Sequence, residues 1–223
     1  MTLLLVAHGT RDPGGTAVVY AMAEAVRARL PGVPVAVAFA DVRGPDVTAA
    51  LVALPGPVVV VPAFLASGYH VRVDVPEQIR RSGRHAVLAP PLGPAPGLVT
   101  AARERLVEAG WRRGDPVVLA AAGSSDARAR ADVARAAALL GAHTGGRVRI
   151  GYVATAAPRI GAVVSALGER AAVASWLLAP GLFHRTAVDS GAAVVADPLG
   201  AHPKVVDLIV RRYLEARCYA TAA

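Results

Sequence analysis

The stretch LLVAHGTRD, residues 4–12, decides the fold because VLAAAGSSD, residues 118–126, repeats its pattern. Both copies carry an apolar strand-like run into a short turn that ends in aspartate. Two further matches follow in the same order: ASGYHVRV (66–73) with PGLFHRTA (180–187), and PLGPAP (91–96) with PLGAHP (198–203). Ordered matches of this kind indicate an internal duplication.

Each copy alternates short apolar runs with segments of helical period, such as Val19, Met22, Val26 and Leu30 on one face. Apolar strands separated by helices indicate βαβ units and parallel sheets covered on both faces. The sequence therefore predicts an α/β fold of two similar domains, 1–113 and 114–223, each a four-stranded parallel sheet flanked by helices. WRRGDP (111–116) is the polar joint. The expected strands are Leu3–Ala7, Val33–Ala40, Val58–Val61, His85–Ala89, Val117–Ala121, Val148–Ala154, Val173–Ala179 and Ala192–Ala196.

The composition limits the possible classes of protein. The chain has 223 residues and a formal net charge of +8, with a single cysteine, Cys218. One cysteine excludes an intrachain disulfide framework and a cysteine-ligated cluster. The most apolar long segment, Val52–Ala66, is broken by prolines and is too short to span a bilayer. No signal peptide is visible before the first strand, so we expect a cytoplasmic protein.

The basic charge has two explanations, attraction to an anionic partner or a compositional bias toward arginine, since Lys204 is the only lysine. The arginines are dispersed and have few aromatic residues among them, which argues against nucleic-acid binding. A small polyanionic substrate stays open.

Three chemistry-bearing side chains follow strands of the first copy. His8 follows the first strand, Asp41 the second and His70 the third. Because ligands of open parallel sheets bind at the carboxyl ends of the strands, we expect these residues to meet at one edge. Two imidazoles and a carboxylate suit a divalent first-row metal. Three unrelated polar loop residues are the alternative.

The second copy lacks this set. Ala122 stands where His8 is expected, the segment 151–158 has no carboxylate, and only His184 matches a histidine, His70. The serines of its AGSSD turn, Ser124 and Ser125, open a helix whose free N–H groups could hold a substrate carboxylate. An ordinary helix N-cap is the alternative.

The other histidines, His85, His143 and His202, have a structural interpretation. The opening LLLVAHG is also similar to that of histidine phosphatases. However, Ala7 stands where that family needs a phosphate-binding arginine, and no Walker A, GxSxG or GxGxxG pattern is present.

Four motifs together resemble the sirohydrochlorin chelatases of class II, the cofactor-independent cobalto- and ferrochelatases in their long, two-domain form. The resemblance covers nearly the whole chain, and its motifs are VAHGTRDPGG (6–15), GYHVRVDVP (68–76), GYVATAAPR (151–159) and ADPLGAHP (196–203). Two positions depart from the family pattern. Asp41 ends AFAD where many members have glutamate, and Ala95 replaces a histidine in PLGPAP.

The resemblance implies insertion of Fe²⁺ or Co²⁺ into sirohydrochlorin, in siroheme or cobalamin biosynthesis, without a permanently bound cofactor. His8 and His70 would handle the metal and the protons, and Asp41 would orient a histidine or relay protons. Arg11 and Arg72 would grip substrate carboxylates, with plain surface charge as the alternative. The sequence does not choose among iron, cobalt and nickel.

A different class of function stays open, a non-catalytic tetrapyrrole or metal carrier on the same fold. We expect no nucleic acid or membrane as partner, and a covalent pair of halves could stand as a monomer.

Overall fold

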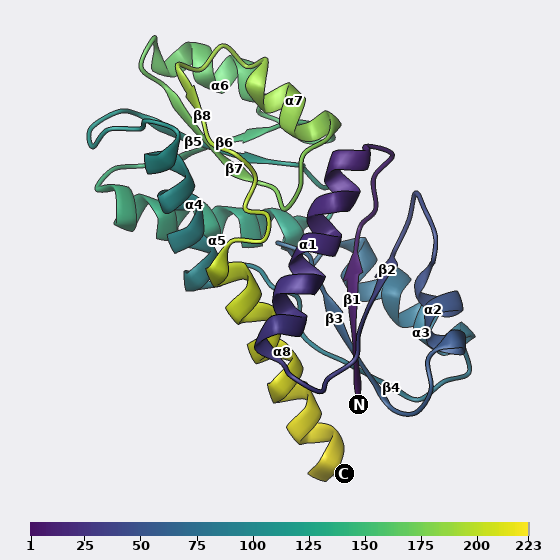
Figure 1. The fold of residues 1–223 in the computed structure, drawn as a ribbon. Helices are drawn as coiled ribbons and strands as arrows, with labels where there is room; N and C mark the ends of the chain where they lie inside the picture. Colours follow the sequence, from purple (N-terminus) through teal and green to yellow (C-terminus); the bar gives the residue numbers. More distant parts are fainter. Residues whose placement is uncertain (223) are drawn as a thin grey trace.

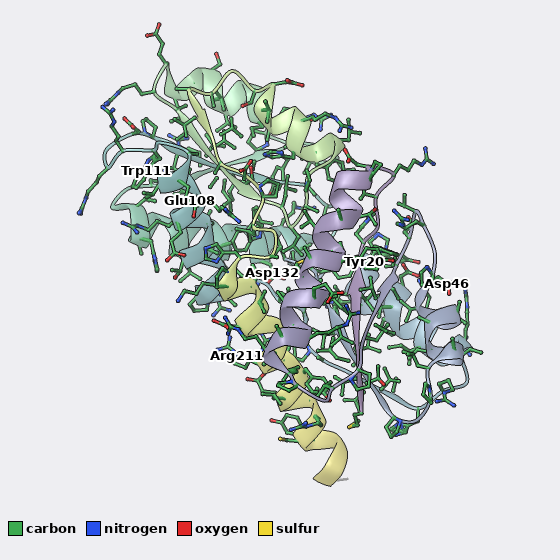
Figure 2. The ribbon with its side chains drawn as sticks, in the orientation of Figure 1. Tyr20, Asp46, Glu108, Trp111, Asp132 and Arg211 are labelled. Carbon is green, nitrogen blue, oxygen red and sulfur yellow. The ribbon has the colours of Figure 1, made fainter. Side chains whose placement is uncertain are left out.

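Two parallel four-stranded sheets form the frame of the molecule, one in each half (Figure 1). The structure is a computed structural model that describes the backbone of residues 1–222 and the side chains of residues 1–219, which Figure 2 draws on the ribbon. Sheet A has the strand order β2-β1-β3-β4, and sheet B has the matching order β6-β5-β7-β8. The strands are β1 Thr2–Ala7, β2 Val35–Phe39, β3 Val58–Pro62, β4 Ala86–Leu88, β5 Val117–Ala121, β6 Arg149–Tyr152, β7 Ala172–Trp176 and β8 Val194–Val195. The predicted fold class is confirmed.

Helices follow the strands in both halves. They are α1 Pro13–Arg29, α2 Val47–Ala53, the π-helix η1 His70–Asp74, α3 Val75–Arg81, α4 Pro96–Glu108, α5 Ala127–Thr144, α6 Ile160–Leu167, α7 Leu182–Val188 and α8 Pro203–Ala222. The first helix of each half begins at a matching aspartate. Asp12 accepts a hydrogen bond from the Gly14 N–H, and Asp126 accepts one from the Arg128 N–H, so each carboxylate caps a helix N-terminus.

Some predicted strands are longer than the observed ones. Val173–Ala179 pairs only to Trp176, and Ala192–Ala196 pairs only at Val194–Val195. The reason is that an apolar run marks buried residues, and the buried residues extend beyond the part of the strand that is hydrogen-bonded to its neighbours. Leu177, one residue beyond β7, is buried although it lies outside the strand.

The inner faces of the two sheets share one hydrophobic core. Leu3 and Leu5 of β1 belong to the same buried cluster as Leu119 of β5. The outer faces have separate clusters, because Leu4 and Val6 pack under α2 and α3, while Val118 packs with α6 and α7. An apolar layer between the sheets therefore holds the halves together.

The last helix of each half crosses to the other half. Although α8 follows sheet B in the sequence, it packs against β3, β4 and α1, and α4 follows sheet A but packs against β7 and α5 (Figure 1). The Tyr213 hydroxyl of α8 donates a hydrogen bond to the Met1 carbonyl (2.8 Å) at the start of sheet A. The expected boundary at residues 113 and 114 stays a prediction.

The helices of residues 1–222 include none that combines the length and the apolar character needed to cross a membrane.

Candidate active site

His8 leaves β1 in a loop that touches the loop after β2. The Asp41 N–H donates to the His8 carbonyl (2.9 Å), and Gly9 has a φ of +100°. A Cβ on Gly9 would lie 2.1 Å from the Asp41 carbonyl oxygen, so only glycine fits there. The backbone thus holds His8 and Asp41 side by side at the carboxyl edge of sheet A.

His70 begins η1, after the loop that follows β3, and its ring meets that of His8. The ring centroids lie 4.5 Å apart with the planes nearly perpendicular. The Phe64 ring stacks beside His70 at 6.1 Å, so one side of the pair is apolar. His8 is exposed and His70 half-buried. The edge therefore presents two imidazoles that can act on one small target.

Asp41 does not join this pair as a third ligand. Its carboxylate Oδ1 accepts a hydrogen bond from the Val42 N–H (2.6 Å), and Val42 has a φ of 71° that few non-glycine residues adopt. Within the described residues, no group of three or more His, Cys, Asp or Glu side chains is arranged to hold a metal ion. Of the three residues expected at this edge, the structure brings two rings together and turns the carboxylate onto its own loop.

The carboxylate that does contact the pair is Asp74, which does not follow the end of a strand and was not predicted. Its Oδ2 lies 2.8 Å from Nδ1 of His70. Both belong to η1, and π-helical turns occur often at functional sites. The i, i+4 spacing of His70 and Asp74 within GYHVRVDVP was the available clue.

The two arginines expected to bind substrate differ in their surroundings. Arg11 is exposed and forms no ion pair among the residues that the structure describes. Arg72 lies 3.8 Å from the carboxylate of Asp126 in the other half. Because both side chains of that pair are partly exposed, the attraction is weak and leaves Arg72 able to exchange partners.

A second ion pair repeats this contact from the opposite half. Arg185 of α7 donates to Asp12 (2.7 Å), and Asp12 occupies the position of Asp126 in the first copy. The hydrogen bond from Arg185 holds the pKa of the Asp12 carboxyl below its usual range. Each helix-capping aspartate thus binds an arginine of the other half.

The loop of Ser124 and Ser125 is satisfied largely from within the chain. Ser124 Oγ accepts from the Asp126 N–H (3.1 Å), and the carbonyls of both serines accept from Arg130 (2.9 and 2.7 Å). The Asp126 side chain caps the N-terminus of α5, as expected for an ordinary helix N-cap. Binding of substrate by the two serines stays a prediction.

A family model, CbiX, matches residues 2–109 and again residues 116–216. The chain belongs to the CbiX family. The two matches correspond to the two copies seen in the sequence, so the duplication is a duplication of a CbiX unit.

Solved structures are similar over nearly the whole chain. SirB from Bacillus subtilis with Fe³⁺ has a TM-score of 0.82 at 23% identity, covering 99% of this chain and 97% of that one. A CbiX described as the terminal enzyme for siroheme biosynthesis in denitrifying bacteria has a TM-score of 0.78 at 26% identity, covering 97% and 99%. SirB of Bacillus subtilis subspecies spizizenii, a sirohydrochlorin chelatase in complex with cobalt, scores 0.77 at 23% identity and covers 96% and 94%. No curated protein matches the sequence.

The second CbiX unit lacks the imidazole pair. Ala122 takes the place of His8, and strand register places Ala154 opposite it, where Asp41 lies in the first unit. His184 remains, but its Nε2 faces the Ala196 carbonyl at 3.4 Å. The edge of sheet B therefore repeats the backbone of the first unit without its imidazole pair.

The remaining histidines lie away from the pair. His85 and His143 are exposed. His202 is buried at the start of α8, with Nε2 3.0 Å from Glu104 of α4. His202 therefore joins the two crossing helices, in agreement with a structural role.

Proposed function

We propose that this chain is a sirohydrochlorin chelatase that inserts Fe²⁺ or Co²⁺ into the tetrapyrrole, in siroheme or cobalamin biosynthesis. The observation that carries the proposal is the pair of imidazoles, His8 and His70, 4.5 Å apart at the exposed edge of sheet A. Membership of the CbiX family supports it, as does similarity to a CbiX enzyme of siroheme biosynthesis and to SirB structures with iron and cobalt. The metal is a substrate.

Insertion replaces two pyrrole N–H protons with one metal ion, so the site must deliver a cation and remove two protons. A neutral imidazole nitrogen binds first-row metals and accepts protons near neutral pH. His8 and His70 present the metal to one face of the macrocycle and take up the released protons. Asp41, held beside His8 by the backbone, relays protons toward solvent.

The substrate is flat and carries several carboxylates. A chain with a net charge of +8 attracts it, and Arg11 and Arg72 bind its carboxylates at the rim. Ser124 and Ser125 bind from the second half, which supplies the wall facing the disc. We propose that the reaction takes place in the cytoplasm and that the enzyme is a monomer.

The test mixes purified protein with sirohydrochlorin and Co²⁺ or Fe²⁺ and follows the absorption change of metallation. We expect initial rates proportional to protein concentration and many turnovers per protein molecule, well above the spontaneous rate. A spectral shift that stops at one equivalent of protein, without turnover, would reject the enzyme and favour a tetrapyrrole or metal carrier. Comparing the metallation rates with Fe²⁺ and Co²⁺ shows which metal the enzyme prefers.

A further inference from the structure

A chain of hydrogen bonds begins at Nδ1 of the His70 ring. Asp74 Oδ2 contacts Nδ1 of His70 (2.8 Å), and the other oxygen, Oδ1, accepts from Nε2 of Gln78 (2.9 Å). His70, Asp74 and Gln78 follow one another at four-residue spacing, so they share one helical face. The chain runs from the edge of the site into the protein, where Gln78 is buried.

The amide of Gln78 can have only one orientation. Its Oε1 accepts from the Val47 N–H (3.0 Å), and its Nε2 donates to the Ala40 carbonyl (2.9 Å) as well as to Asp74. Exchanging the oxygen and nitrogen would set the amide nitrogen against an N–H donor and the oxygen against a carbonyl. The backbone around β2 and α2 therefore fixes Gln78, and Gln78 fixes Asp74.

We propose that Asp74 is a positioning residue that sets the tautomer and direction of the His70 ring, with Gln78 as its support. A carboxylate only accepts hydrogen bonds, so a neutral His70 donates its Nδ1 proton to Asp74 and keeps an open lone pair on Nε2. That nitrogen is the one available for a metal or a proton. The inference rests on the proposed function for its role in turnover, and on geometry alone for the tautomer.

The second half shows that the fold does not need a carboxylate at this position. At the position that matches Asp74 the second half has Val188, which is exposed, and its His184 has no carboxylate partner among the described contacts. The helix after β7 forms without this aspartate. The carboxylate is thus present where the imidazole pair is present and missing where the pair is lost.

The decisive variant is Asp74→Asn, which keeps the shape. Because Gln78 still offers an N–H, the new amide must turn its oxygen to Gln78 and its NH₂ to His70. Nδ1 then has to accept, and the proton moves to Nε2. We expect ¹⁵N NMR to show His70 protonated at Nδ1 in the wild type and at Nε2 in the variant.

Co²⁺ binding and metallation kinetics give two further measurements on Asp74→Asn. Binding of Co²⁺ alone, followed by its absorption bands, should weaken about 10–100-fold, the usual effect of losing such a partner. In the metallation assay kcat should fall by a similar factor while KM for sirohydrochlorin stays within about twofold, because both oxygens of Asp74 are engaged by His70 and Gln78 and the proposed role acts through the His70 ring. A merely structural role would leave the tautomer unchanged.

Asp74→Val is the second variant, because the matching position of the other half already carries valine. It should fold, lose the single Nδ1 tautomer and weaken Co²⁺ binding. Glu77→Gln is the control. Glu77 is a neighbouring carboxylate whose pKa is lowered to about 2 by the hydrogen bond from Arg80, and its bonds run to arginines on the surface.

The proposal is overturned if Asp74→Asn keeps the wild-type tautomer, or if its Co²⁺ affinity stays within about twofold of that of Glu77→Gln. Failure of the wild type to metallate sirohydrochlorin would reject the proposed function instead. The tautomer and the Co²⁺ titration would still decide the role of Asp74, because neither uses the tetrapyrrole.

Discussion

The first strand of sheet A leads directly into His8, and the matching strand of sheet B leads directly into Ala122, although both continue into the same glycine turn. The same difference recurs around the edge. Asp41 corresponds to Ala154 in strand register, and Asp74 corresponds to Val188 in the sequence repeat. The same arrangement of strands and turns therefore occurs once with these three polar residues and once without them. Folding of the unit does not require them. This difference supports our proposal that the first half carries out the chemistry while the second half supplies a wall of the site.

The largest expected effect comes from removing an imidazole of the pair. His70→Ala should lower kcat for metallation by about 10²–10⁴, the contribution typical of a positioned acid or base. His143→Ala is the control, since His143 lies at the end of α5 away from the pair. An equal loss of kcat in His70→Ala and His143→Ala would contradict the assignment of the reaction to the first half.

The loop contact at Gly9 should show the next largest effect, on stability. Gly9→Ala places a methyl group against the Asp41 carbonyl at 2.1 Å and forces alanine to a φ of +100°, so we expect the free energy of unfolding to fall by at least about 2 kcal/mol. Gly110→Ala isolates the cost of φ, because Gly110 has a φ of +99° and no atom within 4 Å of an added Cβ.

The matching glycine of the second half sharpens this result. A Cβ on Gly123 would lie 3.0 Å from the Ala156 nitrogen, so a small shift would relieve it. Urea unfolding should rank Gly9→Ala as the least stable variant, with Gly123→Ala and Gly110→Ala closer to wild type. If Gly9→Ala unfolded like Gly110→Ala, the close approach of the His8 and Asp41 loops would be contradicted.

Arg11 gives a smaller effect, on substrate binding. Arg11→Gln should raise KM for sirohydrochlorin about fivefold with kcat nearly unchanged, because an exposed ion pair contributes up to about 1 kcal/mol. Ser125→Ala, at the matching position of the second half, should change KM less. The effect of Arg11→Gln should shrink as salt is added, and an unchanged KM at low salt would leave Arg11 as surface charge only.

The smallest effect concerns pH and the ion pair between Asp12 and Arg185. Because that hydrogen bond lowers the pKa of Asp12 in the folded state, the pair stabilises the protein above the unfolded value near 3.8. This contribution is lost as the pH falls through the folded pKa. Asp12→Asn should be slightly less stable at neutral pH, and its stability should fall less steeply below pH 3.8.

The opposite pair supplies the comparison. Arg72 and Asp126 are 3.8 Å apart, farther than the 2.7 Å of Arg185 and Asp12. Asp126→Asn should therefore change stability at neutral pH less than Asp12→Asn does. Unfolding curves at several pH values measure both, and a larger loss in Asp126→Asn would contradict the ranking.

Much of the frame could be predicted from the sequence because it depends on local patterns. Apolar runs and turn residues located all eight strands, and the ordered matches revealed the duplication. The crossing of α4 and α8 could not be predicted in this way. An amphipathic helix shows which face is buried, but nothing in its period says which of two similar sheets it covers.

The arrangement of residues at the candidate site could be predicted only in part. His8 and His70 follow parallel strands, and parallel strands end at one edge, so their meeting follows from topology. Asp41 also follows a strand, but its carboxylate turned to the Val42 N–H, a local bond that topology does not reveal. Asp74 was missed because its clue is helical spacing from His70, inside a segment expected to be a loop. Its role, like that of the other site residues, stays a prediction.

The most direct test compares His8→Ala with His184→Ala in the metallation of sirohydrochlorin by Co²⁺, at equal protein concentration and with folding checked by circular dichroism. Chemistry confined to the first half predicts a rate for His8→Ala close to the spontaneous background and a rate for His184→Ala within about threefold of wild type. Equal losses in the two variants, or a nearly active His8→Ala, would contradict the assignment of the reaction to the edge of sheet A.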